Sequence, residues 1–366
     1  MKHARPRWRA AAAVTAAALA LTACSITGGS EQETTTGTAA DGSTVADRDV
    51  TLLVHDSWYL PRKVLRAFEE ETGYRVEVQT NGDAGSLTNK LVLTADNPLG
   101  DAVFGIDNTF ATRAADEGVL APYTPADLPA SAADYALDGE AGEQLTPVDW
   151  GDVCVNVDDA WFAERDQAPP RTLADLADPA YRDLFVTPAA STSSPGFAFL
   201  LATVGEYGED GWQDYWTRLM DNGARVAKDW TEAYTVDFTA GGGDGDRPIV
   251  LSYSSSPPFT IPKGEERPTT SALLETCFRQ VEYAGVLAGA DNPEGAQSLL
   301  DFLVDRTFQK ALPDSMYVYP VDAETPLPPL WEEWAEPATD PIEVDPAEVT
   351  AQRDEWIRTW SDLTAG

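Results

Sequence analysis

Apolar and polar residues follow two different periods along the chain from about residue 49 onward. Residues 49–58 and 74–80 have the short apolar or alternating runs typical of strands, whereas 61–73 repeats apolar residues at helical spacing. Residues 86–98 are again helical, and 101–107 form a third apolar run. Strands that alternate with helices predict a parallel, doubly wound sheet, in which ligands bind beyond the carboxyl ends of the strands.

The same alternation returns after residue 170 and predicts a second domain of this kind. A long β-rich stretch, 145–158, leads from the first set to the second, and 277–287 forms a return strand. A long amphipathic helix is predicted over 292–313. The closing helix begins with Asp345 as its N-cap and Pro346 at its first position.

The two connections predict an α/β protein with two doubly wound domains, a hinge and a ligand cleft between the domains. We expect residues 49–152 and 279–366 to form the first domain and 153–278 the second. The crossover and return strands should run side by side at the hinge. Strand ends at residues 55–58, 81–83 and 107–108 should meet at one rim of the cleft.

The N-terminus has the pattern of an export signal. A basic segment precedes an apolar run that is too short to span a bilayer, and Leu-Thr-Ala-Cys follows at 21–24. This ending resembles a bacterial lipoprotein signal, which implies cleavage after residue 23 and a lipid on Cys24 that anchors the protein to the outer face of the cytoplasmic membrane. An ordinary signal peptide is the alternative. Residues 24–48 are rich in Ser, Thr and Gly and should form a flexible tether.

The net charge, the cysteines and the histidines limit which ligands and which kinds of site are possible. The formal net charge of -36 makes nucleic acid an unsuitable partner and a cation a suitable one, although solubility alone would also account for it. Cys154 and Cys277 either form a disulfide, which an exported compartment permits, or remain buried thiols. After removal of the signal, His55 is the one remaining histidine, which excludes a His-rich metal site.

Aromatic residues occur where predicted strands give way to loops. Trp230 and Tyr234 follow one strand, and Tyr253 and Phe259 lie at the end of the next. Rings at strand ends are placed to hold a flat ligand, although each one alone is equally compatible with core packing. The hydroxyl-rich segment at 191–194 opens a helix and suits either an anion or simple capping.

Several segments together resemble the thiamine-binding proteins of ABC importers. They occur in the family's order from about residue 50 to the C-terminus and include GDAGSLTNKL, DAVFGIDN, STSSPG, KDWTEAY, LSYSSSP and MYVYPV. The resemblance implies the class II periplasmic binding protein fold, thiamine or its phosphate esters as ligand, and an ABC permease as partner. It implies no cofactor, no catalytic activity and a monomer.

The resemblance also implies roles for individual side chains. Aromatic faces bind flat cations, and thiamine joins a flat aminopyrimidine to a cationic thiazolium. Asp83 would hydrogen-bond the aminopyrimidine, and Ser193 would lie where the ester phosphates of thiamine sit. The full set of expected ligand-binding residues is Asp83, Trp230, Tyr253, Ser193, Tyr234, His55, Phe259, Tyr317, Ser194 and Asp107. His55 and Phe259 stand where relatives have tyrosine, and Tyr317 stands near a family tryptophan.

Other ligands and an enzyme remain alternatives. The same fold could bind a polyamine through carboxylates such as Asp83, Asp107 and Glu232, or it could bind a phosphonate or ferric iron. The spacing of the tyrosines in MYVYP does not match the adjacent tyrosines of iron-binding relatives. Residues 55–57, His-Asp-Ser, contain the letters of a catalytic triad, but consecutive residues on one strand cannot converge on a substrate.

Overall fold

The computed structural model describes residues 48–365. The predicted signal peptide, the lipidation at Cys24 and nearly all of the predicted tether lie outside this range. Within residues 48–365, no helix combines the length and apolar character needed to cross a bilayer.

The strands of the described chain form one mixed sheet. They are β1 (Asp49–Val54), β2 (Arg75–Thr80), β3 (Ala102–Asp107), β4 (Leu120–Ala121), β5 (Thr146–Asp158), β6 (Phe185–Pro188), β7 (Arg225–Ala227), β8 (Ile249–Tyr253), β9 (Thr270–Ala272), β10 (Phe278–Leu287) and β11 (Tyr319–Pro320). The strand order is β2-β1-β3-β10-β5-β8-β6-β7, with β4 paired to β10 and with β9 and β11 paired to β5.

Helices and short helical turns connect and cover these strands. The α-helices are α1 (Arg62–Thr72), α2 (Ala84–Leu93), α3 (Ala111–Asp116), α4 (Gly139–Gln144), α5 (Asp159–Glu164), α6 (Leu173–Leu176), α7 (Ser194–Tyr207), α8 (Trp212–Asp221), α9 (Pro293–Leu303), α10 (Arg306–Gln309), α11 (Leu312–Met316), α12 (Pro329–Trp334) and α13 (Pro346–Thr364). The shorter turns are η1 (Ala130–Tyr135), η2 (Pro179–Tyr181), the π-helical η3 (Glu232–Asp237), η4 (Pro257–Thr260) and η5 (Leu274–Thr276).

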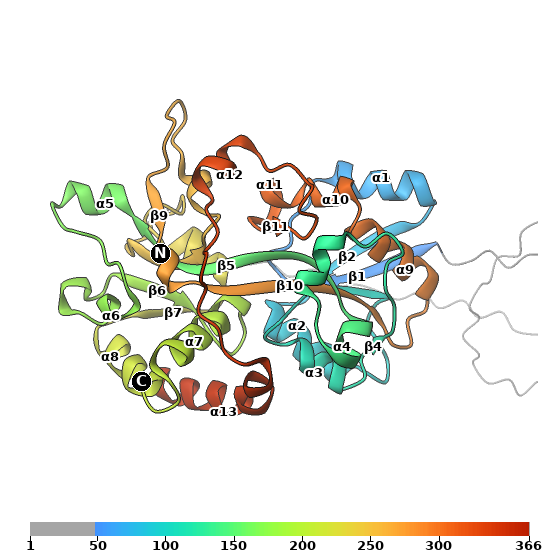
Figure 1. Cartoon of the computed structure of the whole chain (residues 1–366), viewed down its shortest axis with the longest axis horizontal. Helices are drawn as coiled ribbons and strands as arrows, with labels where there is room; N and C mark the ends of the chain where they lie inside the picture. The colour runs from blue at the N-terminus through green and yellow to red at the C-terminus, as the bar shows by residue number, and fades with distance from the viewer. Residues whose placement is uncertain (1–47, 366) are drawn as a thin grey trace, which may run out of the picture. The chain divides into compact units, whose positions relative to one another are not determined.

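The sheet has a parallel group of strands at each end and antiparallel strands between them. β1 pairs in parallel with β2 and β3, and β6 pairs in parallel with β7 and β8, as the strand-helix alternation predicts. β10 is antiparallel to both β3 and β5, and β5 is antiparallel to β8. Figure 1 shows β5 and β10 side by side between the two groups. The expected pairing of the crossover and return strands is therefore confirmed.

Local sequence accounts for several helix boundaries. The Asp345 carboxylate accepts the Ala347 N–H at 2.8 Å and begins α13 with Pro346 in the first turn, as predicted. The prediction of one continuous helix over 292–313 was wrong, because α9 ends at Leu303. Asp305 then caps a new short helix by accepting the Thr307 N–H at 2.6 Å. Side-chain capping here outweighs the continuing apolar period.

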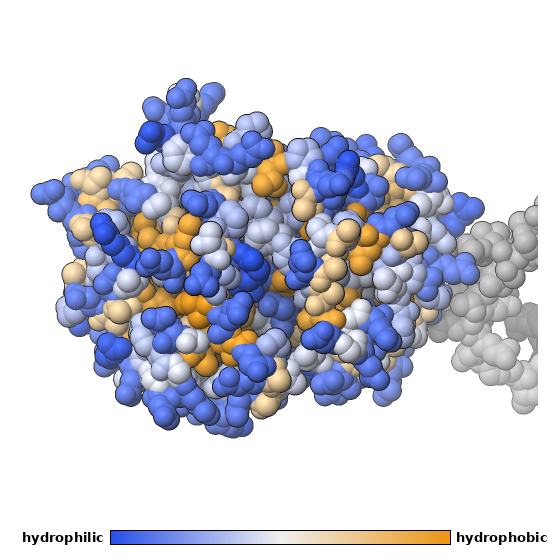
Figure 2. All heavy atoms as spheres, viewed as in Figure 1, coloured by the Kyte–Doolittle hydropathy of each residue, from blue (hydrophilic) through white to orange (hydrophobic). Residues whose placement is uncertain are grey.

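The core lies on both faces of the sheet. β3 is buried at every position, and α7 is buried from Ser194 to Val204. Trp216 of α8 and Trp360 of α13 pack edge to face, with ring centroids 5.6 Å apart. On the face seen in Figure 2, hydrophilic residues cover most of the surface. This packing fixes the strand ends from which the candidate site is built.

Candidate functional site

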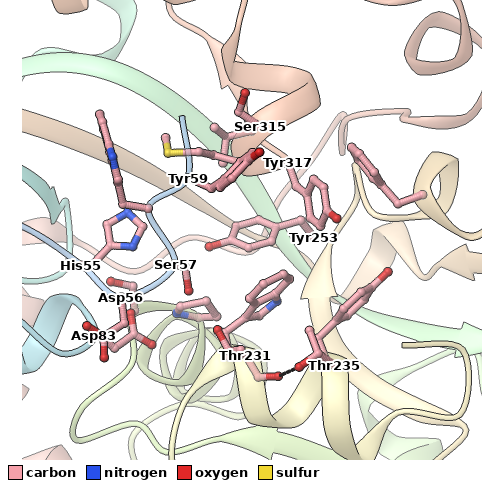
Figure 3. Close-up of a pocket in the computed structure, with 18 of the residues that line it drawn as sticks. His55, Asp56, Ser57, Tyr59, Asp83, Thr231, Thr235, Tyr253, Ser315 and Tyr317 are labelled. Atoms are coloured by element: carbon pink, nitrogen blue, oxygen red, sulfur yellow. Dashed lines mark hydrogen bonds between the residues drawn. The ribbon is translucent and has the colours of Figure 1, made fainter. Parts of the chain in front are cut away.

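A cavity of about 630 Å³ lies where the ends of β1 and β8 meet the start of α7, the π-helical η3 and the end of α11. Figure 3 shows His55, Asp56 and Asp83 grouped in one part of it, with Thr231 and Thr235 in another. The lining residues are His55, Asp56, Ser57, Trp58, Tyr59, Asp83, Ser194, Pro195, Trp230, Thr231, Tyr234, Thr235, Ala240, Gly241, Gly242, Tyr253, Phe259, Glu282, Asp314, Ser315, Met316, Tyr317 and Val318.

Trp230 is the centre of an aromatic cluster in this cavity. Its ring stacks on Tyr234 with centroids 5.1 Å apart and 12° between the planes. Tyr253 and Tyr317 lie at larger angles to it, with centroids at 6.4 and 6.0 Å. The indole N–H donates to the Ser252 hydroxyl at 3.0 Å, which fixes the orientation of the ring. Such a cluster offers π faces to a flat or cationic ligand.

The backbone is adapted to hold two of these rings. Gly151 on β5 leaves room for Tyr253, because a Cβ at Gly151 would lie 2.9 Å from the tyrosine ring. Tyr317 has a left-handed backbone with φ 63°, which is uncommon for a bulky residue. The Ser255 hydroxyl donates to the Tyr317 carbonyl, and the Tyr317 ring lies 3.6 Å from that of Phe259, centroid to centroid. Strained residues of this kind occur most often at binding sites.

Asp83 supplies a buried carboxylate at the opposite part of the cavity. It is the N-cap of α2, and its Oδ1 accepts the Ala84 N–H at 2.9 Å. Its Oδ2 is buried and has no hydrogen-bond partner among residues 48–365. Burial raises the pKa of Asp83 above its ordinary value, although the charge of His55 acts in the opposite direction. The unpartnered oxygen is suited to accept a hydrogen bond from a ligand N–H.

Ser194 lines the cavity, whereas Ser193 and Asp107 do not. Ser193 is the fully buried N-cap of α7, and Asp107 is fully buried at the end of β3. The Asp107 carboxylate accepts hydrogen bonds from the Thr109 N–H at 2.7 Å, from the Thr109 hydroxyl and from the Ser194 hydroxyl. Burial raises the pKa of Asp107 to about 7, against the effect of the Thr109 hydrogen bonds. Asp107 therefore positions Ser194 from behind the cavity.

Glu282 lines the cavity and was not identified from the sequence. It lies in the middle of β10 and is 6% exposed. Its Oε2 is 3.5 Å from the Nε2 of His55, and its Oε1 accepts a hydrogen bond from Gln280 at 3.2 Å. The available signal was an acidic residue between the apolar Val281 and Tyr283 of a predicted strand. The segment 314–316 at the end of α11 was also missed, and nothing in its pattern sets it apart.

The polar part of the cavity carries acidic groups and almost no basic ones. Asp56, Asp83, Glu282 and Asp314 line it, and none of the described lining residues is lysine or arginine. Within residues 48–365, no group of three or more histidine, cysteine or acidic side chains is arranged to hold a metal ion. The cavity therefore combines aromatic faces with negative charge, which suits an organic cation.

Comparison with known proteins identifies the family. A family model described as bacterial extracellular solute-binding protein matches residues 97–251. A thiamine-binding periplasmic protein of Escherichia coli K12 is 32% identical over 325 residues, which cover 85% of this chain and 92% of the relative. The chain belongs to the bacterial extracellular solute-binding proteins. This solute-binding protein also resembles a solved periplasmic thiamin binding protein, with 28% identity, a TM-score of 0.75 and coverage of 90% of this chain and 98% of the other.

A more distant structure shares the fold of this solute-binding protein. Iron-bound HitA from Pseudomonas aeruginosa has a TM-score of 0.66 and 19% identity, over 86% of this chain and 99% of the other. Together with the nearer structure, it shows the predicted fold class of two α/β domains with a ligand cleft between them. The relatives are binding proteins rather than enzymes.

The two cysteines lie away from the cavity. Cys154 on β5 and Cys277 directly before β10 form a disulfide with a Cα–Cα distance of 4.2 Å. Both are fully buried. The bridge joins the two central strands of the sheet.

Proposed function

We propose that this solute-binding protein captures thiamine outside the cytoplasmic membrane and delivers it to the permease of an ABC importer. The observation that carries the proposal is the cavity, which sets the aromatic cluster around Trp230 beside the carboxylates of Asp83 and Glu282. The names of the relatives support the same ligand. The protein would act as a monomer, without a cofactor, held at the membrane by a lipid on Cys24.

The proposed ligand uses both parts of the cavity. Trp230 and Tyr253 would hold the thiazolium and the pyrimidine, with Tyr234, Phe259 and Tyr317 completing the aromatic side. The unpartnered Oδ2 of Asp83 would accept the amino group of the pyrimidine. Domains with the predicted boundaries, 49–152 with 279–366 and 153–278, would close on the ligand about β5 and β10.

The structure favours free thiamine over its phosphate esters. A phosphate would have to bind near Ser194 at the start of α7, where helix N–H groups and a hydroxyl are available. Since no lysine or arginine of the described chain lines the cavity, the ester phosphate would bind there without a permanent positive charge to offset its own negative charge. We therefore expect affinity to fall from thiamine to its monophosphate and again to its diphosphate.

A polyamine is the second candidate, favoured by the carboxylates that line the cavity. A titration of tryptophan fluorescence with thiamine, its two phosphates, spermidine and ferric iron separates the possibilities. Thiamine should bind most tightly and quench the emission, because Trp230 and Trp58 both line the cavity. Binding of spermidine without binding of thiamine would overturn the proposal.

A further inference from the structure

A cluster of buried acidic side chains surrounds Glu282 at one end of the cavity. Glu282 pairs across the sheet with Asp107 of β3 on one side and with Asp149 of β5 on the other. Asp149 is fully buried, and both of its carboxylate oxygens lack a hydrogen-bond partner among residues 48–365. Burial, and next the charge of Glu282, raise the pKa of Asp149 well above its ordinary value. Asp149 and Glu282 are thus neighbouring buried acids, and Glu282 is the one of the two that lines the cavity.

His55 is the basic side chain that faces this cluster. Its imidazole and the Glu282 side chain are each only 7% exposed, and Nε2 has no hydrogen-bond partner among the described residues apart from the 3.5 Å contact with Glu282. Gly105 of β3 leaves room for the imidazole, because a Cβ at Gly105 would lie 2.2 Å from the His55 ring.

Burial and three nearby carboxylates act on the pKa of His55. Burial acts most strongly on the pKa of His55 and would lower it. The carboxylates of Glu282, Asp83 and Asp56 outweigh burial and raise the pKa above its ordinary value. These groups come from β10, from the start of α2 and from the loop that follows β1. In its protonated form, His55 forms an ion pair with Glu282 across the 3.5 Å between Nε2 and Oε2.

We propose that Glu282 pairs with the positive charge of the bound ligand, and that the ligand replaces protonated His55 in this role, so that binding releases the imidazole proton to solvent. The inference rests on the proposed function, because it requires a cationic ligand such as the thiazolium of thiamine. A second positive charge beside Glu282 repels the imidazolium, which lies in a site with little water to screen it. Loss of the proton from Nε2 removes that repulsion and leaves a neutral imidazole beside the bound cation.

The sign of the pH dependence follows from this exchange. Below the His55 pKa of the empty site, a proton must leave before the cation can bind. Thiamine affinity should therefore fall about tenfold for each unit by which the pH is lowered. Above that pKa, affinity should be independent of pH. The neutral aminopyrimidine half of thiamine, 4-amino-5-hydroxymethyl-2-methylpyrimidine, should bind without proton release and without this dependence.

Histidine NMR tests the exchange in the otherwise unaltered protein. The chain has two histidines, and His3→Gln leaves His55 as the single histidine signal. Saturating thiamine should lower the pKa measured for His55 by about one unit or more, whereas the neutral pyrimidine half should not. A pKa that stays constant or rises when thiamine binds overturns the inference and leaves the proposed function standing. A protein that does not bind thiamine overturns both.

Calorimetry identifies the group that loses the proton. Thiamine binding measured near pH 6.5 in buffers of different ionisation enthalpy should release between half a proton and one proton, and His55→Gln should abolish the release while binding persists. Glu282→Gln should weaken thiamine at least tenfold and leave the neutral half unaffected. Release that survives in His55→Gln but disappears in Asp149→Asn would assign the proton to the acidic pair and overturn the role of His55.

Discussion

Arg279 of β10 and Asp152 of β5 form a bidentate ion pair, which also connects the central strands to the C-terminal segment at Ala338. The guanidinium donates to the two carboxylate oxygens at 2.8 and 3.1 Å, and to the Ala338 carbonyl at 3.0 Å. The Ala338 N–H donates to the same carboxylate at 2.7 Å. Arg279 also lies 4.6 Å from the centroid of the Trp150 ring. The Asp152 side chain is fully buried, and Arg279 is the cation that pairs with it.

Arg279→Met should lower the free energy of unfolding by about 3 kcal/mol, because the change leaves a buried carboxylate without its counter-charge. Urea denaturation followed by circular dichroism measures the loss. The matched control is Arg75→Met, since Arg75 pairs with Asp49 at 3.2 Å while both side chains are about two thirds exposed or more. The control should cost less than about 1 kcal/mol. Equal losses in the two variants would show that burial of Asp152 does not decide the effect.

The disulfide should stabilise the fold by restricting the unfolded chain. Cys154 and Cys277 are 123 residues apart in sequence, and closing a loop of that length contributes about 4 to 5 kcal/mol in the chain-entropy model. Replacing both residues by alanine should lower the free energy of unfolding by up to about that amount. Reductant should destabilise the parent and leave the double variant unchanged. Two reactive thiols in the unfolded, unreduced parent, Cys24 apart, would rule the bridge out.

Local signals were sufficient to predict the order of elements and much of the cavity lining. Strand ends carry His55, Asp83 and Tyr253, and the rule that ligands bind beyond the carboxyl ends of strands placed them together. The cap at Asp345 and the apolar strand β3 were also predicted from the sequence, because each depends on residues that are neighbours in sequence.

The remaining features depend on contacts between distant segments. Glu282 reaches the cavity from the middle of β10, at a point where the register against β5 shifts between Glu282 and Tyr283. Such a bulge redirects side chains, and it arises from pairing with strands more than 100 residues away in sequence. The inward position of Asp107 similarly depends on Ser194 of α7. Local patterns in the sequence do not reveal these registers.

Lipidation at Cys24 remains a prediction from the N-terminal pattern, because residues 1–47 lie outside the described chain. Cys24→Ala should prevent acylation and move the protein from the membrane fraction to the soluble fraction or the medium. Metabolic labelling with a fatty acid should mark the parent and not the variant. Cys24→Ser is a second change that keeps the size of the side chain. Retention of either variant at the membrane would argue against a lipid anchor at this residue.

Asp83→Asn should weaken thiamine about tenfold to a hundredfold, because a carboxylate that accepts a hydrogen bond from the aminopyrimidine becomes an amide. The neutral pyrimidine half should lose affinity equally, and the isolated thiazolium alcohol should not. Asp314→Asn is the matched control, since Asp314 also lines the cavity but is exposed to solvent. Equilibrium dialysis measures all three ligands. Equal losses for Asp83→Asn and Asp314→Asn would point to general charge attraction and away from a specific hydrogen bond.

Trp230→Ala should remove most of the aromatic contact with the ligand. We expect a loss of roughly 2 to 4 kcal/mol, as for other buried aromatic residues at the centre of a binding site, which is about 30- to 1000-fold in affinity. Quenching of fluorescence by thiamine should largely disappear with it. Trp230→Phe should recover part of the affinity, because the phenyl ring can still stack on Tyr234 and on the ligand.

The control for Trp230 must lie away from the cavity. Trp331 is unsuitable, because its ring packs against Phe259 of the lining with centroids 6.1 Å apart. Trp161 on α5 does not line the cavity and lies under the guanidinium of Arg165. Trp161→Phe should therefore leave thiamine binding and its quenching unchanged. If Trp230→Ala folds normally and binds thiamine as tightly as Trp161→Phe does, the aromatic cluster is part of the core and not of the binding site.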